Sequence, residues 1–334
     1  MKIALTGIKP TGNLHIGNYF GAIKPALELS QRYTARYFIA DYHALNTVKD
    51  PAELRRYVLE IAAGWLAAGL DPQRVVFYRQ SSVPETFELA TILMAFTAKG
   101  LMNRAHAYKA AAQANGEKGL DADAGVNMGL YTYPALMAAD ILLFDPDAVP
   151  VGRDQTQHVE MAADIAQALN FNYKKPLLKI PEAVVQESVA VVPGLDGRKM
   201  SKSYGNAIPL FAPEKQLRKL VMRVVTNSQG VGESKDPDAS QLFALYKLFA
   251  SEAEQAALAS RYRAGGMGWG DAKEELFYAA NRCLAPMRER FDALIADPAG
   301  LGEVLASGAE RARAIAKETL RRLRDAIGIT MNKE

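Results

Sequence analysis

The first stretch of the chain that could do chemistry is Lys-Met-Ser-Lys-Ser at residues 199–203. Together with Arg198, it places three cations within five positions, and no carboxylate lies inside the run to pair with them. Gly197 and Gly205 bound the run, and flanking glycines favour a loop that can change conformation. Such a loop suits a polyphosphate that is held during a reaction and then released. A solvated surface loop is the alternative for any short Lys/Ser run taken alone.

A second stretch lies near the N-terminus, where residues 7–21 read Gly-Ile-Lys-Pro-Thr-Gly-Asn-Leu-His-Ile-Gly-Asn-Tyr-Phe-Gly. A strand, a turn rich in Gly and Pro, and a helix start would direct free backbone amides and the helix dipole at one anion. Gly12 and Gly17 would let a nucleotide approach the backbone closely. The stretch matches neither the Walker loop nor the dinucleotide-binding fingerprint, and such a turn taken alone is more often structural.

The elements that must position these residues alternate between strand and helix. We expect strands at 3–8, 36–40 and 75–78 and helices at 18–33, 50–69 and 83–93. This order predicts a parallel sheet with helices on its faces. Ligands of such sheets bind beyond the carboxyl ends of the strands, where the strand order reverses. The first candidates are therefore the polar residues just after strands: Lys9, His15, Asp41 and His43.

Composition sets the general class of protein. At 334 residues, the chain is long enough for one large or two modest domains. A net charge of +3 permits a nucleic-acid partner but does not argue for one. The single cysteine, Cys283, excludes an internal disulfide framework. Without a signal-peptide core or a run approaching 18 apolar residues, we expect a cytoplasmic protein that does not enter a membrane.

Taken together, the two stretches resemble the paired motifs of class I aminoacyl-tRNA synthetases. The first motif is His15-Ile16-Gly17-Asn18, and the second is the run at 199–203, about 180 residues later. The resemblance implies an α/β fold, with a Rossmann-like parallel-sheet catalytic domain followed by an all-helical anticodon-binding domain. We expect the first over 1–208, with a helical insertion near 85–145, and the second over 209–334.

Two central segments, 129–143 and 149–158, are similar to bacterial tryptophanyl-tRNA synthetases. Tyr133, Met137 and Asp140 fall at i, i+4 and i+7, on one face of a helix. An apolar face with one carboxylate suits an indole, because the N–H is the only polar atom of its ring. The resemblance implies that Asp140 accepts this N–H.

The same resemblance assigns further contacts to the amino acid and to ATP. Tyr133 and Gln155 are expected to hold the α-amino and carboxylate end of tryptophan, Asp154 the ATP ribose, and His43 to lie in the tryptophan pocket. Without the resemblance, Tyr133 and Met137 fit plain core positions equally well. A satisfied structural histidine is likewise the alternative for His43.

The implied reaction has two steps. The tryptophan carboxylate attacks the ATP α-phosphate in line and releases pyrophosphate, and the terminal ribose hydroxyl of tRNA(Trp) then attacks the acyl carbon. Such chemistry needs positioning and charge neutralisation. We therefore expect His15 and Asn18 to donate hydrogen bonds, and Lys199 and Lys202 to follow the β- and γ-phosphates. The expected ATP-binding set is Lys9, Thr11, Gly12, Gly17, Asn18, Lys109, Gly152, Asp154, Lys199, Met200, Ser201 and Lys202.

The remaining expectations concern the metal ion, the oligomeric state and the positions that depart from the family pattern. Mg²⁺ should accompany ATP through its phosphates and waters. No protein-held metal is predicted, because the four histidines, at 15, 43, 106 and 158, are widely separated in the sequence. The resemblance also implies a homodimer.

Lys9 stands where the bacterial family commonly has Gln; it would strengthen anion binding or else point to solvent. Arg153 replaces a usual Glu, and Lys109 lies where the family keeps a mobile basic loop over ATP.

Helical periodicity continues from about Ala212, with helices expected at 213–224, 241–249, 252–262, 271–291 and 309–327. Basic outer faces on the first and last of these could bind tRNA phosphates, although acidic residues mixed into the last helix also fit a solvated face. The loop at 226–240 is expected to be a flexible hinge. Three alternatives remain open: a tyrosyl-tRNA synthetase, a catalytically idle paralogue that binds tRNA or senses tryptophan, and a nucleotidyltransferase.

Overall fold

A parallel sheet forms the centre of the computed structural model, which describes residues 2–152, 155–185 and 192–330. In it β1 (Ile3–Ile8) pairs with β2 (Thr34–Ile39), β2 with β3 (Val76–Arg79), and β4 (Val149–Val151) with β5 (Ala183–Val185). A parallel bridge between Ala4 and Ala148 joins β1 to β4, so that the strand order is β5-β4-β1-β2-β3. The order reverses between β1 and β4, which places the expected ligand site beyond their carboxyl ends.

Helices cover both faces of the sheet, as the alternation of strands and helices predicts. Tyr37 and Ile39 pack into the core with α2 (Lys24–Ser30) and α4 (Pro51–Ala67). Their neighbour Phe38 points to the other face, because successive strand side chains alternate. That second face is covered by α5 (Glu85–Met94), α8 (Met128–Leu142) and α9 (Thr156–Tyr173). Asp50 caps α4 as predicted, accepting from the backbone amides of Ala52 and Glu53.

Short helical turns follow three of the strands and carry side chains to the edge of the sheet near which the strand order reverses. The helix expected at 18–33 is divided into α1 (Ile16–Asn18), a π-helical turn η1 (Tyr19–Ile23) and α2. After β2 comes α3 (Asp41–Ala44), and after β3 comes the 3-10 turn η2 (Gln80–Ser82). These turns place polar residues directly at the ends of the strands.

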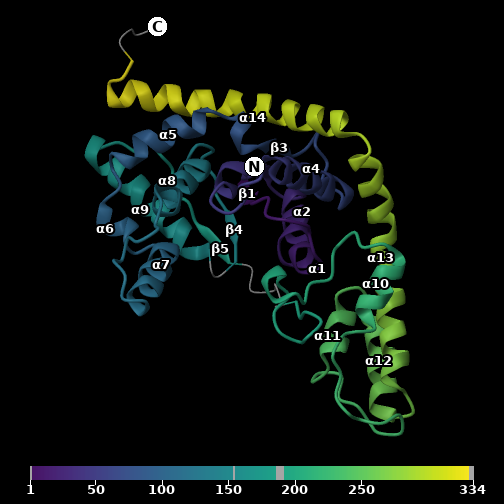
Figure 1. The fold of residues 1–334 in the computed structure, drawn as a ribbon. Coiled ribbons are helices and arrows are strands. Elements are labelled where there is room, and N and C mark those ends of the chain that lie inside the picture. The colour runs from purple at the N-terminus through teal and green to yellow at the C-terminus, as the bar shows by residue number, and fades with distance from the viewer. Residues whose placement is uncertain (1, 153–154, 186–191, 331–334) are drawn as a thin grey trace.

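The remaining helices form the C-terminal half and a flank of the half that contains the sheet. Figure 1 shows α14 running along the top over the sheet, and α13 leading from its end to α10, α11 and α12. The flanking helices are α6 (Lys99–Met102) and α7 (His106–Glu117). The C-terminal helices are α10 (Glu214–Val221), α11 (Gln241–Lys247), α12 (Glu252–Ala264), α13 (Trp269–Ile295) and α14 (Pro298–Ile327).

The last helix begins earlier than the sequence predicts and packs on the sheet. Pro298 stands in its first turn and Asp297 caps it, accepting from Gly300 N at 3.0 Å. Glycines at 300, 302 and 308 weaken the helical pattern there, which explains why periodicity becomes clear only near 309. Ala312 and Leu320 are buried as expected, in one core with the strands.

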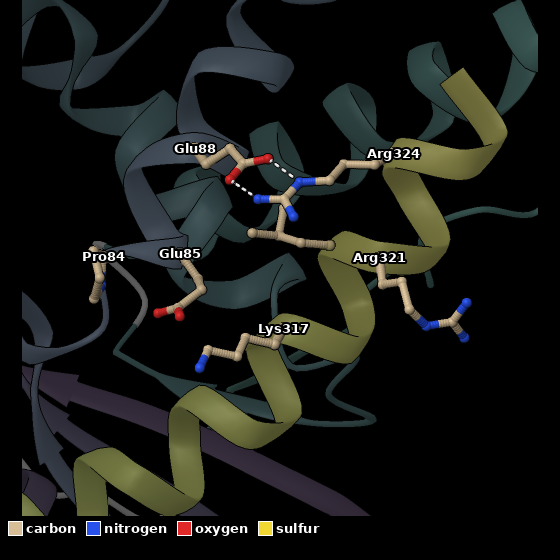
Figure 2. Close-up of a pocket in the computed structure, with 7 residues that line it drawn as sticks. Pro84, Glu85, Glu88, Lys317, Arg321 and Arg324 are labelled. Atoms are coloured by element: carbon tan, nitrogen blue, oxygen red, sulfur yellow. Dashed lines mark hydrogen bonds and ion pairs between the residues drawn. The ribbon is translucent and has the colours of Figure 1, made fainter. Parts of the chain in front are cut away.

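Several arginines of α14 have partners within the protein. Arg313 lies 3.0 Å from the Glu85 carboxylate, and Arg324 makes two hydrogen bonds with Glu88 (Figure 2). Arg311 donates to the carbonyls of Pro72 and Val75. Between α5 and α14 lies a cavity of about 460 Å³, lined by Pro84, Glu85, Glu88, Lys317, Leu320, Arg321 and Arg324. These arginines therefore attach α14 to α5 and to the segment before β3, which leaves less of this basic face free for the phosphate contacts that the sequence suggested.

Two segments expected to be mobile loops have defined structure. Residues 106–117 form α7, all of whose side chains are at least partly exposed. In the segment 226–240, Lys235 is 1% exposed, and its ammonium donates to the carbonyls of Gly230 and Glu233. It also lies 5.4 Å from the centre of the Trp269 ring. A buried lysine with these partners anchors the segment to α13.

Within the ranges that the structure describes, no helix combines the length and apolarity needed to span a bilayer.

The contact between α14 and β3 predicts a specific sensitivity to substitution. A Cβ on Gly308 would lie 1.7 Å from the carbonyl oxygen of Phe77. We expect Gly308→Ala to lower the free energy of unfolding by about 2 kcal/mol or more, because helix and strand must separate. Gly302→Ala is the matched control: nothing lies within 4 Å of its Cβ, and it should stabilise α14 by up to about 1 kcal/mol. Urea unfolding measures both, and equal effects would contradict this packing.

Candidate functional site

His15 and Asn18 form a reciprocal cap at the start of α1. His15 Nδ1 accepts from Asn18 N at 3.2 Å, and Asn18 Oδ1 accepts from His15 N at 3.1 Å. Because Nδ1 acts as an acceptor, a neutral imidazole carries its proton on Nε2. His15 therefore offers an N–H donor, and the Asn18 side-chain amide keeps its NH₂ for a ligand. This arrangement leaves each residue with an N–H that could donate, as the predicted role requires.

Burial and a nearby cation keep His15 neutral. The side chain is 7% exposed, and desolvation together with the charge of Lys202 lowers its pKa from 6.5 to about 4. At neutral pH this residue is thus a neutral donor beside a lysine.

The structure brings the two motifs together across 183 residues. Gly17 N lies 3.4 Å from Met200 Sδ, and Ile16 N donates to Ile208 O at 3.0 Å. A Cβ on Gly17 would lie 2.9 Å from His15 Nδ1 and 3.4 Å from Met200 Cβ. Only glycine allows this close approach without displacing a neighbour. We call residues 11–18 the cradle and residues 199–203 the lysine loop.

Lys202 closes the contact between the cradle and the lysine loop. Its ammonium donates to Thr11 O at 2.9 Å, next to Gly12, whose φ is +95°. Partial burial of this ammonium lowers the pKa of Lys202, and the carboxylate of Glu60 opposes that shift. Lys199 is exposed. A cavity of about 230 Å³ adjoins this contact, lined by Asn13, Leu14, His15, Lys202, Ala207 and Pro209.

The lysine loop is held by Asn206, which the sequence analysis did not single out. Asn206 is 3% exposed; its oxygen accepts from Ser201 N at 2.8 Å, and its NH₂ donates to Lys199 O at 3.2 Å. The same NH₂ donates to Asp196 at 2.6 Å, which lowers the pKa of that carboxyl. The sequence clue was an Asn directly after a glycine that bounds the loop.

The first cation of this stretch has a carboxylate partner just outside the run. Arg198 is not an unpaired cation, because its guanidinium contacts the Asp196 carboxylate at 2.6 Å and lies 4.6 Å from the Tyr204 ring. The pairing carboxylate lies just outside the run. Of the three cations, Lys199 and Lys202 are therefore the ones placed to meet an anion.

A second cluster surrounds Asp140, whose side chain is buried inside α8 at 2% exposure. His43 Nε2 lies 2.9 Å from one carboxylate oxygen, and Gln80 Nε2 lies 2.9 Å from both. Burial raises the pKa of Asp140, while the hydrogen bonds from His43 and Gln80 oppose the shift. The cluster combines a carboxylate predicted to read the indole N–H with a histidine predicted for the same pocket.

Gln80 is a site residue that the sequence analysis missed. It is fully buried and is the first residue after β3. The rule that selected Asp41 and His43 after β2 would have found Gln80 too, had it been applied to the third strand. Asp41 itself is occupied elsewhere, accepting from the backbone amide and hydroxyl of Ser81 at 3.0 and 2.5 Å.

Tyr133 lies between two histidines and hydrogen-bonds one of them. Its hydroxyl hydrogen-bonds His158 Nε2, and His158 Nδ1 lies 2.9 Å from Gln155 Oε1. Its ring centre lies 6.4 Å from that of His43 and 5.1 Å from that of His158. These histidines are widely separated in the sequence, so the contact between His158 and Tyr133 was not predicted. Burial raises the pKa of Tyr133, which keeps the phenol protonated as a donor.

The other predicted residues lie around these clusters. Met137 is half-buried on α8, Ser201 hydrogen-bonds Ser203 at 2.8 Å, and Gly152 follows β4 and accepts from Gln155 N at 2.9 Å. Lys9 lies just after β1, and its side chain as a whole is exposed. Protein atoms around the ammonium still displace part of its hydration, which lowers its pKa.

Two predicted ATP contacts, Lys109 and Asp154, are left without support from the described contacts. Lys109 is exposed on α7. Arg153 and Asp154 lie outside the described residues. Within the described ranges, no group of three or more His, Cys, Asp or Glu side chains could hold a metal ion.

The environment of His15 predicts its titration. Its pKa should be near 4 by NMR, and Lys202→Met should raise it, because one of the two causes is removed. The unfolded chain takes up this proton near 6.5, so the free energy of unfolding should fall as the pH drops from 6.5 to 4, by up to about 3 kcal/mol. A His15 that titrates near 6.5 and ignores Lys202→Met would contradict this site geometry.

Comparison with known proteins identifies the family of this chain. The family model for class I tRNA synthetases (W and Y) matches residues 2–285. The tryptophan–tRNA ligase of Pseudomonas aeruginosa is 54% identical, over 99% of this chain and 74% of its own. The ligase of Xanthomonas axonopodis is 53% identical, over 97% of this chain and 76% of its own.

Solved structures give the same result. The tryptophanyl-tRNA synthetase of Campylobacter jejuni, complexed with ADP and tryptophan, is 44% identical, with 98% of this chain and 99% of that chain covered at a TM-score of 0.89. Its Mycoplasma pneumoniae counterpart is 29% identical at a TM-score of 0.80, with 98% of each chain covered. The chain therefore belongs to the class I tRNA synthetases and, within them, to the tryptophan–tRNA ligases.

Proposed function

We propose that the two clusters of this tryptophan–tRNA ligase divide the work of forming tryptophanyl-adenylate. The observation that supports this division is the contact between the cradle and the lysine loop, which joins Lys202 to Thr11 O across 191 residues. The cradle and loop bind the polyphosphate of ATP, and the Asp140 cluster binds tryptophan. The relatives reported above carry the tryptophan name, which supports tryptophan over the tyrosine alternative.

ATP is held by donors and cations. His15 Nε2–H and the Asn18 NH₂ donate to the phosphate region, and Gly12 and Gly17 allow the chain of phosphates to approach the backbone. Lys202 leaves the Thr11 carbonyl for the phosphates, and Lys199 joins it, so that both neutralise the charge that develops on pyrophosphate. The further contacts proposed for ATP come from Lys9, Lys109, Gly152, Asp154, Met200 and Ser201.

Mg²⁺ belongs with ATP in this proposal. It usually keeps several waters and binds through substrate phosphates, where it neutralises charge and orients the reacting groups. Lys199 and Lys202 would share that charge neutralisation, while His15, which is neutral, contributes only a hydrogen bond. No additional protein-held metal is proposed.

Tryptophan binds between α8, α3 and the end of β4. Asp140 accepts the indole N–H, and Met137 packs against the rings. Tyr133 and Gln155, connected through His158, hold the α-amino and carboxylate end and direct the carboxylate toward the α-phosphate. The Campylobacter jejuni relative is complexed with ADP and tryptophan, which supports the proposal that this chain binds both a nucleotide and tryptophan.

The second step requires tRNA(Trp), whose terminal ribose hydroxyl attacks the acyl carbon. We propose that residues 1–208 form the catalytic domain and residues 209–334 the anticodon-binding domain, with α14 returning to the sheet. Among the basic helices, α10 is the better candidate for tRNA contact, because Lys215 and Lys219 are exposed on it. A homodimer in the cytoplasm is the proposed form of the enzyme, on the resemblance and the single cysteine.

The proposed role of the lysine loop predicts how its loss changes the kinetics. Lys202→Ala should lower kcat for tryptophan-dependent ATP–pyrophosphate exchange by about 10²–10³, while the KM for tryptophan changes little, because the cation acts on charge that develops in the transition state. Lys219→Ala, at an exposed lysine of α10 proposed only for tRNA contact, is the matched control and should leave ATP–pyrophosphate exchange unchanged, because that reaction does not involve tRNA. An equal loss of kcat and of tryptophan affinity would show that the loop builds the pocket instead.

A further inference from the structure

The Gln80 side chain is fixed from both ends. Its amide nitrogen lies 2.9 Å from both oxygens of Asp140, and its oxygen accepts from Tyr42 N at 3.1 Å. A backbone N–H can only donate, so the Gln80 oxygen must face Tyr42 and the NH₂ must face Asp140. The amide is fully buried, which removes water as an alternative partner.

Asp140 depends on protein donors for its charged form. The carboxylate is 2% exposed, and burial by itself raises its pKa. Gln80 and His43 are the two described side chains that donate to it. Hydrogen bonds to the ionised form favour that form. A carboxylate that stays ionised accepts an N–H roughly twice as strongly as a neutral group does.

We propose that Gln80 is a specificity-determining positioning residue that orients Asp140 and keeps it a charged acceptor for the indole N–H. The inference rests on the proposed contact between Asp140 and tryptophan. Gln80 acts through Asp140, and its effect should therefore appear in the choice between amino acids that have or lack that N–H. A glutamine that only filled the core would change stability and leave this choice intact.

The test compares tryptophan with β-(3-benzothienyl)alanine, in which a sulfur atom replaces the indole N–H. The measured quantity is the ratio of kcat/KM for the two amino acids in ATP–pyrophosphate exchange. This ratio does not depend on the fraction of enzyme that is folded, since both substrates meet the same sample. We expect Gln80→Met to lower the ratio about tenfold, the difference between a charged and a neutral acceptor.

Ser81→Ala is the matched control. Ser81 follows Gln80 in the same turn and donates to Asp41, so its loss disturbs η2 at a similar place. The ratio should stay at the wild-type value in this variant. If Gln80→Met yields no soluble protein, Gln80→Asn tests the same point, because it keeps the amide but withdraws it by one methylene from Asp140.

The Asp140→Ala variant distinguishes failure of the inference about Gln80 from failure of the proposed contact between Asp140 and the indole N–H. If Asp140→Ala lowers the ratio and the Gln80 variants do not, Gln80 is structural and the inference is overturned. If Asp140→Ala leaves the ratio unchanged, the proposed contact with the indole N–H is itself wrong. A lower ratio in Asp140→Ala and in the Gln80 variants, with the wild-type ratio kept in Ser81→Ala, supports the positioning role.

Discussion

The structure of the amino-acid site depends on one constraint, which is a carboxylate buried at the edge of a parallel sheet. Removing a charge from water is costly unless donors replace the lost hydration. The Asp140 carboxylate is hydrogen-bonded to His43, in the turn after β2, and to Gln80, in the turn after β3. The parallel sheet makes this possible, because the carboxyl ends of neighbouring strands meet at the same edge. The order of strands, the short turns that follow them and the packing of α8 therefore all serve one acceptor.

The proposed nucleotide site follows a different constraint, because the two lysines of its loop are not held in the structure by a hydrogen-bonded carboxylate among the described residues. Lys202 donates to a backbone carbonyl, and Lys199 is exposed. Asn206 fixes the backbone of the loop without neutralising these two lysines. Gly17 lets the loop approach the cradle closely. The site thus keeps its positive charge available for a substrate that carries negative charge.

Much of this could be predicted from local patterns. The three strands, the cap of α4 at Asp50 and the paired motifs were found because periodicity, capping and glycine placement are readable within a few residues. Gln80 was missed because the rule for polar residues after strands was not applied to the third strand. His158 was missed because its partner Tyr133 lies 25 residues away on another helix, and Asn206 because its contacts depend on how the loop folds back. The arginines of α14 show the same limit: a basic face looks identical in sequence whether it meets solvent, tRNA or Glu85 and Glu88.

The central claim is that a buried acceptor selects an indole for activation by ATP. The most direct test is ATP–pyrophosphate exchange by the full chain, with tryptophan and tyrosine supplied in parallel. A site built around a hydrogen bond to one ring N–H should discriminate strongly, by about 10⁴ or more in kcat/KM. We predict rapid exchange with tryptophan and almost none with tyrosine. Comparable rates with the two amino acids, or faster exchange with tyrosine, would contradict the account.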